Sequence, residues 1–344
     1  MQKGKQKTDF LEDVNLLSGV GIFLVVVGHL PFLEGFNPYQ VTRGWIYSFH
    51  MPLFMALSGF LFAMFSRQKV CSIPDYVSFL KKKVARFIPA YVFTAVLLFF
   101  IKYVVGKGVS LKNPVDVHSF LMMFVNPMDK GFVIHLWFVY TLFLIFVCYP
   151  LFSRVLVPMG GGWQLVFYFL LSLLPITHLF CLNLVFRYLI YFHLGGLLLE
   201  RRNKPIKGEI YYLLGTVFLF WAGIYARSRM DGVFIVTAVI TFLIACLGIV
   251  SCYFFVLQIM KSENVFRKLL NVLGLYSFEI YLFHTLGSET IGYFLRFLFH
   301  GGMVFNLLIL GITTTFCGLY VPIIFTRGIV KYSPKAAKLL FGRT

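Results

Sequence analysis

Residues 45–62 read WIYSFHMPLFMALSGFLF, an almost unbroken apolar run that carries His50 and Pro52. A helix that crosses the roughly 30 Å of membrane hydrocarbon needs about 20 such residues. Similar runs recur along the chain, and 59% of its 344 residues are hydrophobic while only 13% are charged. The mean hydropathy of +0.84 lies far above that of an ordinary soluble domain. The sequence therefore predicts an all-α integral membrane protein.

The apolar runs predict a bundle of about ten transmembrane helices. They are continuous, whereas a strand of a membrane barrel alternates apolar and polar residues. The polar connections are too short to fold alone, so residues 1–344 are expected to form a single membrane domain with no separate soluble domain. The expected spans are residues 14–33, 45–66, 86–105, 133–153, 164–182, 184–200, 210–226, 233–257, 274–298 and 303–326.

The formal net charge of +18 follows the expected topology. Most of the 31 Lys and Arg residues fall in the connections on one side if the N-terminus is cytoplasmic. Cytoplasmic connections of membrane proteins carry such an excess of positive charge. The pattern predicts cytoplasmic N- and C-termini, and the charge requires no nucleic-acid partner.

Histidines stand at the expected ends of several spans. His29 lies near the outer end of span 14–33, His50 near the outer start of span 45–66, and His135 at the start of span 133–153. An imidazole in hydrocarbon is costly unless it faces protein or water. Since a short connection makes the first two spans antiparallel neighbours, His29 and His50 are expected at similar depth. A functional role and a plain hydrogen-bonded interfacial role both remain open.

Span 274–298 carries a polar stripe. Ser277, Tyr281 and His284 recur at i, i+4 and i+7, which is one face of a helix. This stripe either lines a polar cavity or bonds to neighbouring helices. Arg187, inside span 184–200, is a further candidate because an arginine within a span requires a partner or water.

Several common chemistries have no support in the sequence. It contains no Walker loop, no G-x-G-x-x-G, no G-x-S-x-G and no H-E-x-x-H motif. The six cysteines are scattered without C-x-x-C spacing, so we expect small buried side chains and no metal site. What remains is histidine chemistry in a membrane cavity.

Six stretches, in this order, resemble the acyltransferase 3 family of membrane proteins. Within that family they are most similar to the fucose 4-O-acetylase-like sugar O-acetylases and succinyltransferases. The resemblance covers nearly the whole chain. The stretches are VVVGH (25–29), YSFHMPLFMALSGFLF (47–62), FLKKKVARFIPAY (79–91), HLWFVYTLF (135–143), YLIYFHLGGLL (188–198) and LGLYSFEIYLFH (273–284).

The resemblance implies an enzyme that moves an acetyl or succinyl group from cytoplasmic acyl-CoA to a hydroxyl of an envelope or secreted glycan, or of a lipid-linked sugar. Acyl-CoA, most simply acetyl-CoA, is then a donor substrate, and no bound cofactor is expected. His29 matches the essential histidine and is the expected general base, whereas Lys83 and Arg86 match residues assigned to the donor phosphates. Ser58 and Gly59 are expected to allow close helix packing. A bacterial inner membrane is the implied location.

One position departs from the family pattern, which usually has Arg or Lys eleven residues before the first histidine. Here that position is Ser18. Two other readings therefore stay open: a transporter or flippase of a glycan or lipid intermediate, and a membrane module of a larger glycan-synthesis complex. Acyl-CoA dependence together with an essential His29 favours the enzyme, and glycan translocation without acylation favours the transporter. Function that survives loss of His29 favours the module. The oligomeric state is open.

Overall fold

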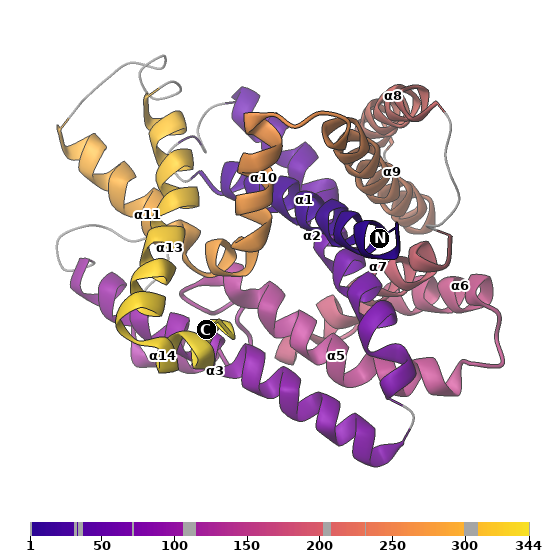
Figure 1. Cartoon of the computed structure of the whole chain (residues 1–344), viewed down its shortest axis with the longest axis horizontal. Helices are drawn as coiled ribbons and strands as arrows, with labels where there is room; N and C mark the ends of the chain where they lie inside the picture. The colour runs from indigo at the N-terminus through magenta and orange to yellow at the C-terminus, as the bar shows by residue number, and fades with distance from the viewer. Residues whose placement is uncertain are drawn as a thin grey trace. The chain divides into compact units, whose positions relative to one another are not determined.

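A computed structural model describes residues 2–30, 33, 37–70, 72–105, 115–201, 208–230, 232–298 and 309–343. Every regular element in these ranges is a helix (Figure 1). The prediction of an all-α protein is thereby confirmed. The elements are α1 (Gln2–Gly28), α2 (Asn37–Phe65), η2 (Arg67–Lys69), α3 (Ile73–Val105), α4 (Val117–Met122), η3 (Ile134–Leu136), α5 (Trp137–Val155), α6 (Gly161–Ser172), η4 (Leu179–Cys181), α7 (Leu182–Arg201), α8 (Glu209–Ser228), α9 (Phe234–Met260), α10 (Val265–Leu275), α11 (Ser277–Leu298), α13 (Gly311–Tyr332) and α14 (Pro334–Phe341).

Seven of the described helices are long and apolar enough to cross a membrane. The number becomes eight if α10 and α11 count as one span bent by 90°. We conclude that the chain is a multi-pass membrane protein. About ten spans and cytoplasmic termini remain predictions, and residues 303–308 of the last expected span lie outside the described ranges.

Two helices differ from the expected spans. Helix α3 is one helix of 33 residues, so the basic stretch before the expected span 86–105 continues into it without a break. Helix α6 has only 12 residues and ends at Ser172, well before the end of the expected span 164–182. Pro175 follows closely, and a proline disfavours helical conformation in the residue before it.

The chain groups into two compact units. Unit 1 comprises Met1–Leu57 and Asn203–Arg327, and unit 2 comprises Ser58–Arg202 and Gly328–Thr344. Helices α1, α8, α9, α10 and α11 belong to unit 1, and helices α3 to α7 and α14 belong to unit 2. The expected single domain stays a prediction.

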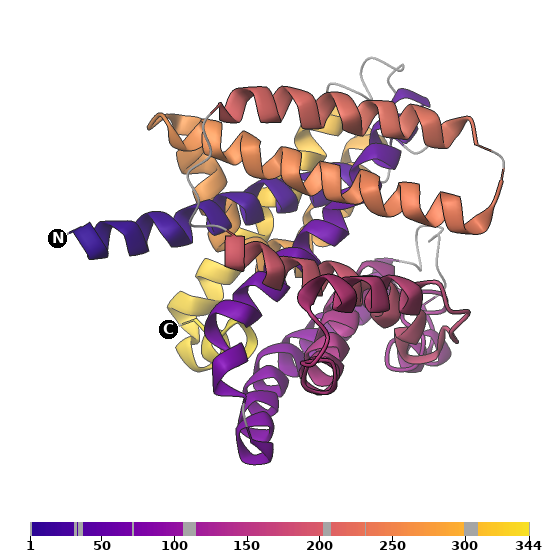
Figure 2. The ribbon, with the colours of Figure 1, turned by 90° about the vertical axis from the view of Figure 1, so that its right-hand side faces the viewer.

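Unit 1 is built around two helix pairs. Helices α8 and α9 run side by side along their lengths (Figures 1 and 2). Helix α1 packs on α10 backbone to backbone: a methyl group added at Gly19 would lie 2.1 Å from the Leu270 carbonyl oxygen, and one at Gly274 would lie 1.9 Å from that of Asn15. Such contact tolerates only glycine, so these two positions fix how α10 lies on α1.

Helix α11 begins after a sharp break. Tyr276, at the C-terminal cap of α10, has φ −102° and ψ 15°, outside the helical range. The 90° bend that follows lets α10 and α11 both contact α1. The expected span 274–298 therefore starts three residues late, at Ser277.

In unit 2, aromatic rings fill the space among the last turns of α2 and helices α3, α5 and α7. Phe62 lies 5.6 Å from Phe79, 6.4 Å from Phe146 and 5.8 Å from Phe192 between ring centroids. A methyl group at Gly59 would lie 1.8 Å from the Phe192 carbonyl oxygen. The close packing expected at Gly59 is thus confirmed.

We expect Gly59→Ala to destabilise the protein by about 1–3 kcal/mol, because α2 and α7 must separate to admit the methyl group. The matched control is Gly215→Ala on α8, where an added methyl group meets nothing within 4 Å. There the change is expected to be neutral or stabilising, since alanine is the better helix former. Thermal unfolding in detergent compares the two variants, and equal transition temperatures would contradict the packing argument.

Candidate active site

His29 stands at the end of α1, where the helix gives way to a turn. Its backbone N–H donates to the Val26 carbonyl oxygen at 3.1 Å, and its Nδ1 lies 2.8 Å from that of Val25. A carbonyl only accepts hydrogen bonds, so Nδ1 carries the hydrogen and the neutral ring keeps its lone pair on Nε2. His29 is half-buried. The ring is thus oriented by its own helix, with Nε2 as the nitrogen able to accept a proton.

Two tyrosines of α2 hold the end of α1. The Tyr47 hydroxyl donates to the Gly28 carbonyl oxygen at 2.9 Å. The Tyr39 hydroxyl donates to the Val27 carbonyl oxygen at 3.0 Å and accepts a hydrogen bond from the Leu30 N–H at 2.9 Å. The last carbonyls of a helix lack partners within it, and each such bond contributes about 1 kcal/mol. The backbone that carries His29 is therefore fixed to α2.

The structure brings His50 and His284 to His29. The ring centroid of His29 lies 6.4 Å from that of His50 on α2 and 5.2 Å from that of His284 on α11. His50 is 3% exposed and His284 is fully buried. The Tyr47 ring lies 5.5 Å from His29 and 5.0 Å from His50. We name these four residues the histidine cluster.

All three histidines share one tautomer. Nδ1 of His50 lies 2.7 Å from the Ile46 carbonyl oxygen, and Nδ1 of His284 lies 2.9 Å from that of Tyr281. In each neutral ring the lone pair is therefore on Nε2. Among the described residues, no group of three metal-ligating side chains is arranged to hold an ion. The arrangement suits proton transfer, with His29 the least buried of the three rings.

The predicted stripe of α11 lies partly at the histidine cluster. Tyr281 is 5% exposed, and its ring centroid lies 6.2 Å from that of His284. Ser277 is the first residue of α11 and is half-buried. The stripe therefore contributes Tyr281 beside His284, while Ser277 stands two helical turns before His284.

The other two predicted cavity residues belong to unit 2. His135 is 8% exposed, in the short helix η3 that precedes α5. Arg187 is exposed on α7. Next to it, the Tyr188 ring stacks on Trp137 with centroids 5.4 Å apart. Within its own unit, Arg187 is thus accessible and His135 is buried.

Lys83 and Arg86, the predicted donor-binding residues, have partners within unit 2. The Lys83 ammonium lies 3.8 Å from the centroid of the Phe146 ring. Nη1 of Arg86 would lie 2.8 Å from a methyl group added at Gly342, the C-terminal cap of α14. The carbonyl end of a helix attracts a cation. Arg86 is therefore fixed near the C-terminal end of α14.

His193 on α7 is a structural histidine. Its Nδ1 accepts from the Tyr149 hydroxyl at 3.0 Å, and its Nε2 donates to the Gly161 carbonyl oxygen at 3.2 Å. Both ring nitrogens are engaged and the side chain is 4% exposed. His193 thus carries its hydrogen on Nε2, the opposite of His29.

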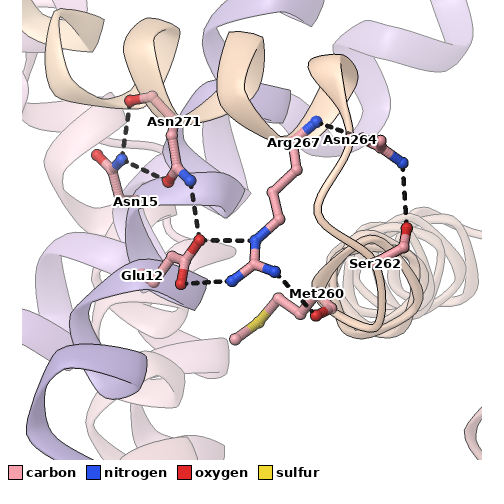
Figure 3. Close-up of polar contacts among 7 residues, drawn as sticks. All are labelled: Glu12, Asn15, Met260, Ser262, Asn264, Arg267 and Asn271. Atoms are coloured by element: carbon pink, nitrogen blue, oxygen red, sulfur yellow. Dashed lines mark hydrogen bonds and ion pairs between the residues drawn. The ribbon is translucent and has the colours of Figure 1, made fainter. Parts of the chain in front are cut away.

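A polar clasp joins α1 to α10, and sequence reasoning missed it (Figure 3). Nε and Nη2 of Arg267 donate to the two carboxylate oxygens of Glu12, both at 2.8 Å. The Asn271 side chain donates to Glu12 at 2.9 Å, and Asn15 donates to the Asn271 carbonyl oxygen at 2.8 Å. The hydrogen bond from Arg267 is the main reason why the pKa of Glu12 is lowered. We call these four residues the clasp.

Ser18, where the resemblance implies a cation, lies one turn beyond the clasp. Its hydroxyl donates to the Val14 carbonyl oxygen of its own helix at 2.9 Å. Arg267 of α10 approaches α1 at Glu12, whose carboxylate pairs with it. Position 18 thus contributes no charge.

Comparison with known proteins gives one match. The family model described as the acyltransferase domain of the acyltransferase 3 family matches residues 11–327, nearly the whole chain. No curated protein and no solved structure matches the chain. The matched range contains all of the histidine cluster and of the clasp. The chain is a multi-pass membrane protein that belongs to the acyltransferase 3 family.

Proposed function

We propose that the protein is a sugar O-acyltransferase of a bacterial inner membrane. It moves an acetyl or succinyl group from acyl-CoA to a hydroxyl of a glycan or of a lipid-linked sugar, and His29 is the general base. One observation carries the assignment of the base: the His29 ring is held through Nδ1, so that its lone pair is on Nε2, in a cluster with two further neutral histidines.

The chemistry needs one proton acceptor. Nε2 of His29 takes the proton of the acceptor hydroxyl as its oxygen attacks the thioester carbonyl carbon. The new C–O bond forms, the C–S bond breaks, and the CoA thiolate leaves with the electron pair and recovers the proton from His29. General-base catalysis of this kind typically contributes 10²–10⁴ in rate. The bond from Nδ1 to the Val25 carbonyl stabilises the transient imidazolium, because the ring then still donates to it.

The neighbours of His29 position it. Tyr47 and Tyr39 hold the end of α1, and the buried rings of His50 and His284 restrict the movement of His29. We assign His50, His284 and Tyr281 to this supporting role, and His135, Arg187 and Ser277 remain proposed contributors to the acceptor cavity.

Acyl transfer is tested by mass spectrometry of envelope glycans from cells that carry the wild-type gene or no gene. An acetyl or succinyl mass increment found only with the gene supports the proposal and identifies the group transferred. Purified protein with acetyl-CoA or succinyl-CoA then identifies the donor. Equal acylation in both strains, together with altered surface exposure of the glycan, favours a transporter instead.

For the donor we expect Arg86→Ala to raise the KM for acyl-CoA roughly tenfold, because a charge-assisted contact to a phosphate is lost. Arg86→Lys retains the charge and is expected to restore part of the affinity. Lys81→Ala, at an exposed position five residues earlier on α3, is the matched control and leaves the KM unchanged. An unchanged KM in Arg86→Ala would remove Arg86 from the donor site.

A further inference from the structure

Unit 2 contains an apolar cavity between α3 and α5, and no residue of the histidine cluster lines it. Its volume is about 230 Å³, and its described lining consists of apolar and aromatic side chains, among them Phe87, Tyr91, Val92, Tyr140 and Leu144. An apolar cavity of about 150 Å³ in another protein binds benzene. This cavity is therefore large enough for a segment of an alkyl chain.

The two phenols that line the cavity offer no hydroxyl hydrogen to a ligand. The Tyr91 hydroxyl donates to the Met123 carbonyl oxygen, and the Tyr140 hydroxyl donates to that of Phe124 at 2.9 Å. Both acceptors follow α4 directly, and Phe124 itself lines the cavity. An occupant with amide groups, such as the pantetheine arm of CoA, would lose its hydrogen bonds to water without replacement. The cavity selects hydrocarbon.

A cation lies on the same face of α3 as two residues that line the cavity. Lys83 precedes Phe87 and Tyr91 by one and two turns of α3, so the three residues share a face. The Lys83 ammonium lies 3.8 Å over the Phe146 ring, and Phe146 in turn stacks on Phe87 with centroids 5.8 Å apart. From Lys83 to Tyr91 the helix rises about 12 Å. Positive charge, then a hydrocarbon-lined space, is complementary to an anionic amphiphile.

We infer that this cavity binds one acyl chain of an anionic phospholipid, whose phosphate pairs with Lys83. Helix α3 passes from three consecutive lysines, Lys81 to Lys83, into its apolar part, as the headgroup-to-chain order of such a lipid requires. The site is independent of acyl transfer. It gives Lys83 a lipid phosphate as its partner and leaves the donor phosphates to Arg86.

The test uses delipidated full-length protein, native mass spectrometry and vesicle-derived phosphatidylglycerol or phosphatidylcholine. The wild type is expected to retain one phosphatidylglycerol about fivefold more tightly than phosphatidylcholine, which is the effect of one cation near a lipid phosphate. Lys83→Gln is expected to abolish that preference. Lys82→Gln, an exposed neighbour, is the matched control and retains it.

Filling the cavity tests the chain site. Val92→Trp on α3 and Leu144→Trp on α5, both at lining positions, are expected to release the retained lipid. Val166→Trp, on an exposed position of α6 outside the cavity, is the matched control. Lipid retained by both cavity variants, or a wild type without preference for phosphatidylglycerol, would overturn the inference. Displacement of the lipid by acetyl-CoA would do so too, by assigning the cavity to the donor.

Discussion

His29→Gln is expected to reduce acyl transfer by a factor of 10²–10⁴, while the amount of protein in the membrane stays unchanged. Removing the base leaves the acceptor hydroxyl protonated, and neither His50 nor His284 is as exposed as His29. One polar side chain replaces another at the end of α1, so membrane insertion is not affected. Transfer is measured with purified protein, labelled acyl-CoA and isolated glycan.

His29→Asn separates orientation from catalysis. The asparagine amide nitrogen takes nearly the place of Nδ1 and can donate to the Val25 carbonyl oxygen as the ring does. We therefore expect a folded protein that is as inactive as His29→Gln. His118→Gln, on an exposed residue of α4, is the control and is expected to keep wild-type activity. Activity of His29→Asn within tenfold of the wild type would exclude His29 as the base.

The sequence predicts the members of the histidine cluster better than their surroundings. Depth in the membrane follows from the apolar runs, and it placed His29 and His50 at the same level, where their rings lie 6.4 Å apart. The i, i+4, i+7 stripe predicts that His284 and Tyr281 share one face of a helix. Tyr39 and Tyr47, in contrast, are two of 19 tyrosines, and no spacing distinguishes a tyrosine that bonds to the end of another helix.

The clasp was beyond sequence reasoning for a different reason. Glu12 and Arg267 are 255 residues apart, and each alone is an ordinary charge outside the expected spans. Their pairing depends on the break at Tyr276, which the continuous apolar pattern of the expected span 274–298 conceals. It depends equally on Gly19 and Gly274, whose role is visible only when the opposing backbone is known.

The second large effect is expected at the clasp. Arg267→Gln leaves the Glu12 carboxylate without its bidentate partner in a site where the two side chains are only 16% and 23% exposed. Breaking a fully buried ion pair costs about 3–5 kcal/mol. Because this pair keeps some exposure to solvent, we expect a loss of about 2–4 kcal/mol. Glu12 lies about 26 Å along α1 from His29, so the loss should appear as less folded protein. Denaturant unfolding in detergent measures it.

Two comparisons make the clasp measurement specific. The combined change Glu12→Arg and Arg267→Glu restores a pair of opposite charges and is expected to recover part of the stability that either single reversal loses. Glu209→Gln removes a more exposed pair, Lys261 with Glu209 at 2.8 Å, where the lysine is 56% exposed. That change is expected to cost less than about 1 kcal/mol. A clasp variant that costs no more than Glu209→Gln would contradict the assignment.

The clasp also predicts a pH dependence with a definite sign. The pKa of Glu12 is lowered in the folded protein, chiefly by the hydrogen bond from Arg267. Its contribution to stability is therefore complete above the pKa of an unfolded glutamate, about 4.3, and disappears as the pH falls through the lowered folded value. Glu12→Gln has no such proton to take up. The difference in unfolding free energy between wild type and Glu12→Gln should be constant from pH 7 to about pH 5 and should shrink below pH 4, and a difference that grows on acidification would refute the ion pair as its source.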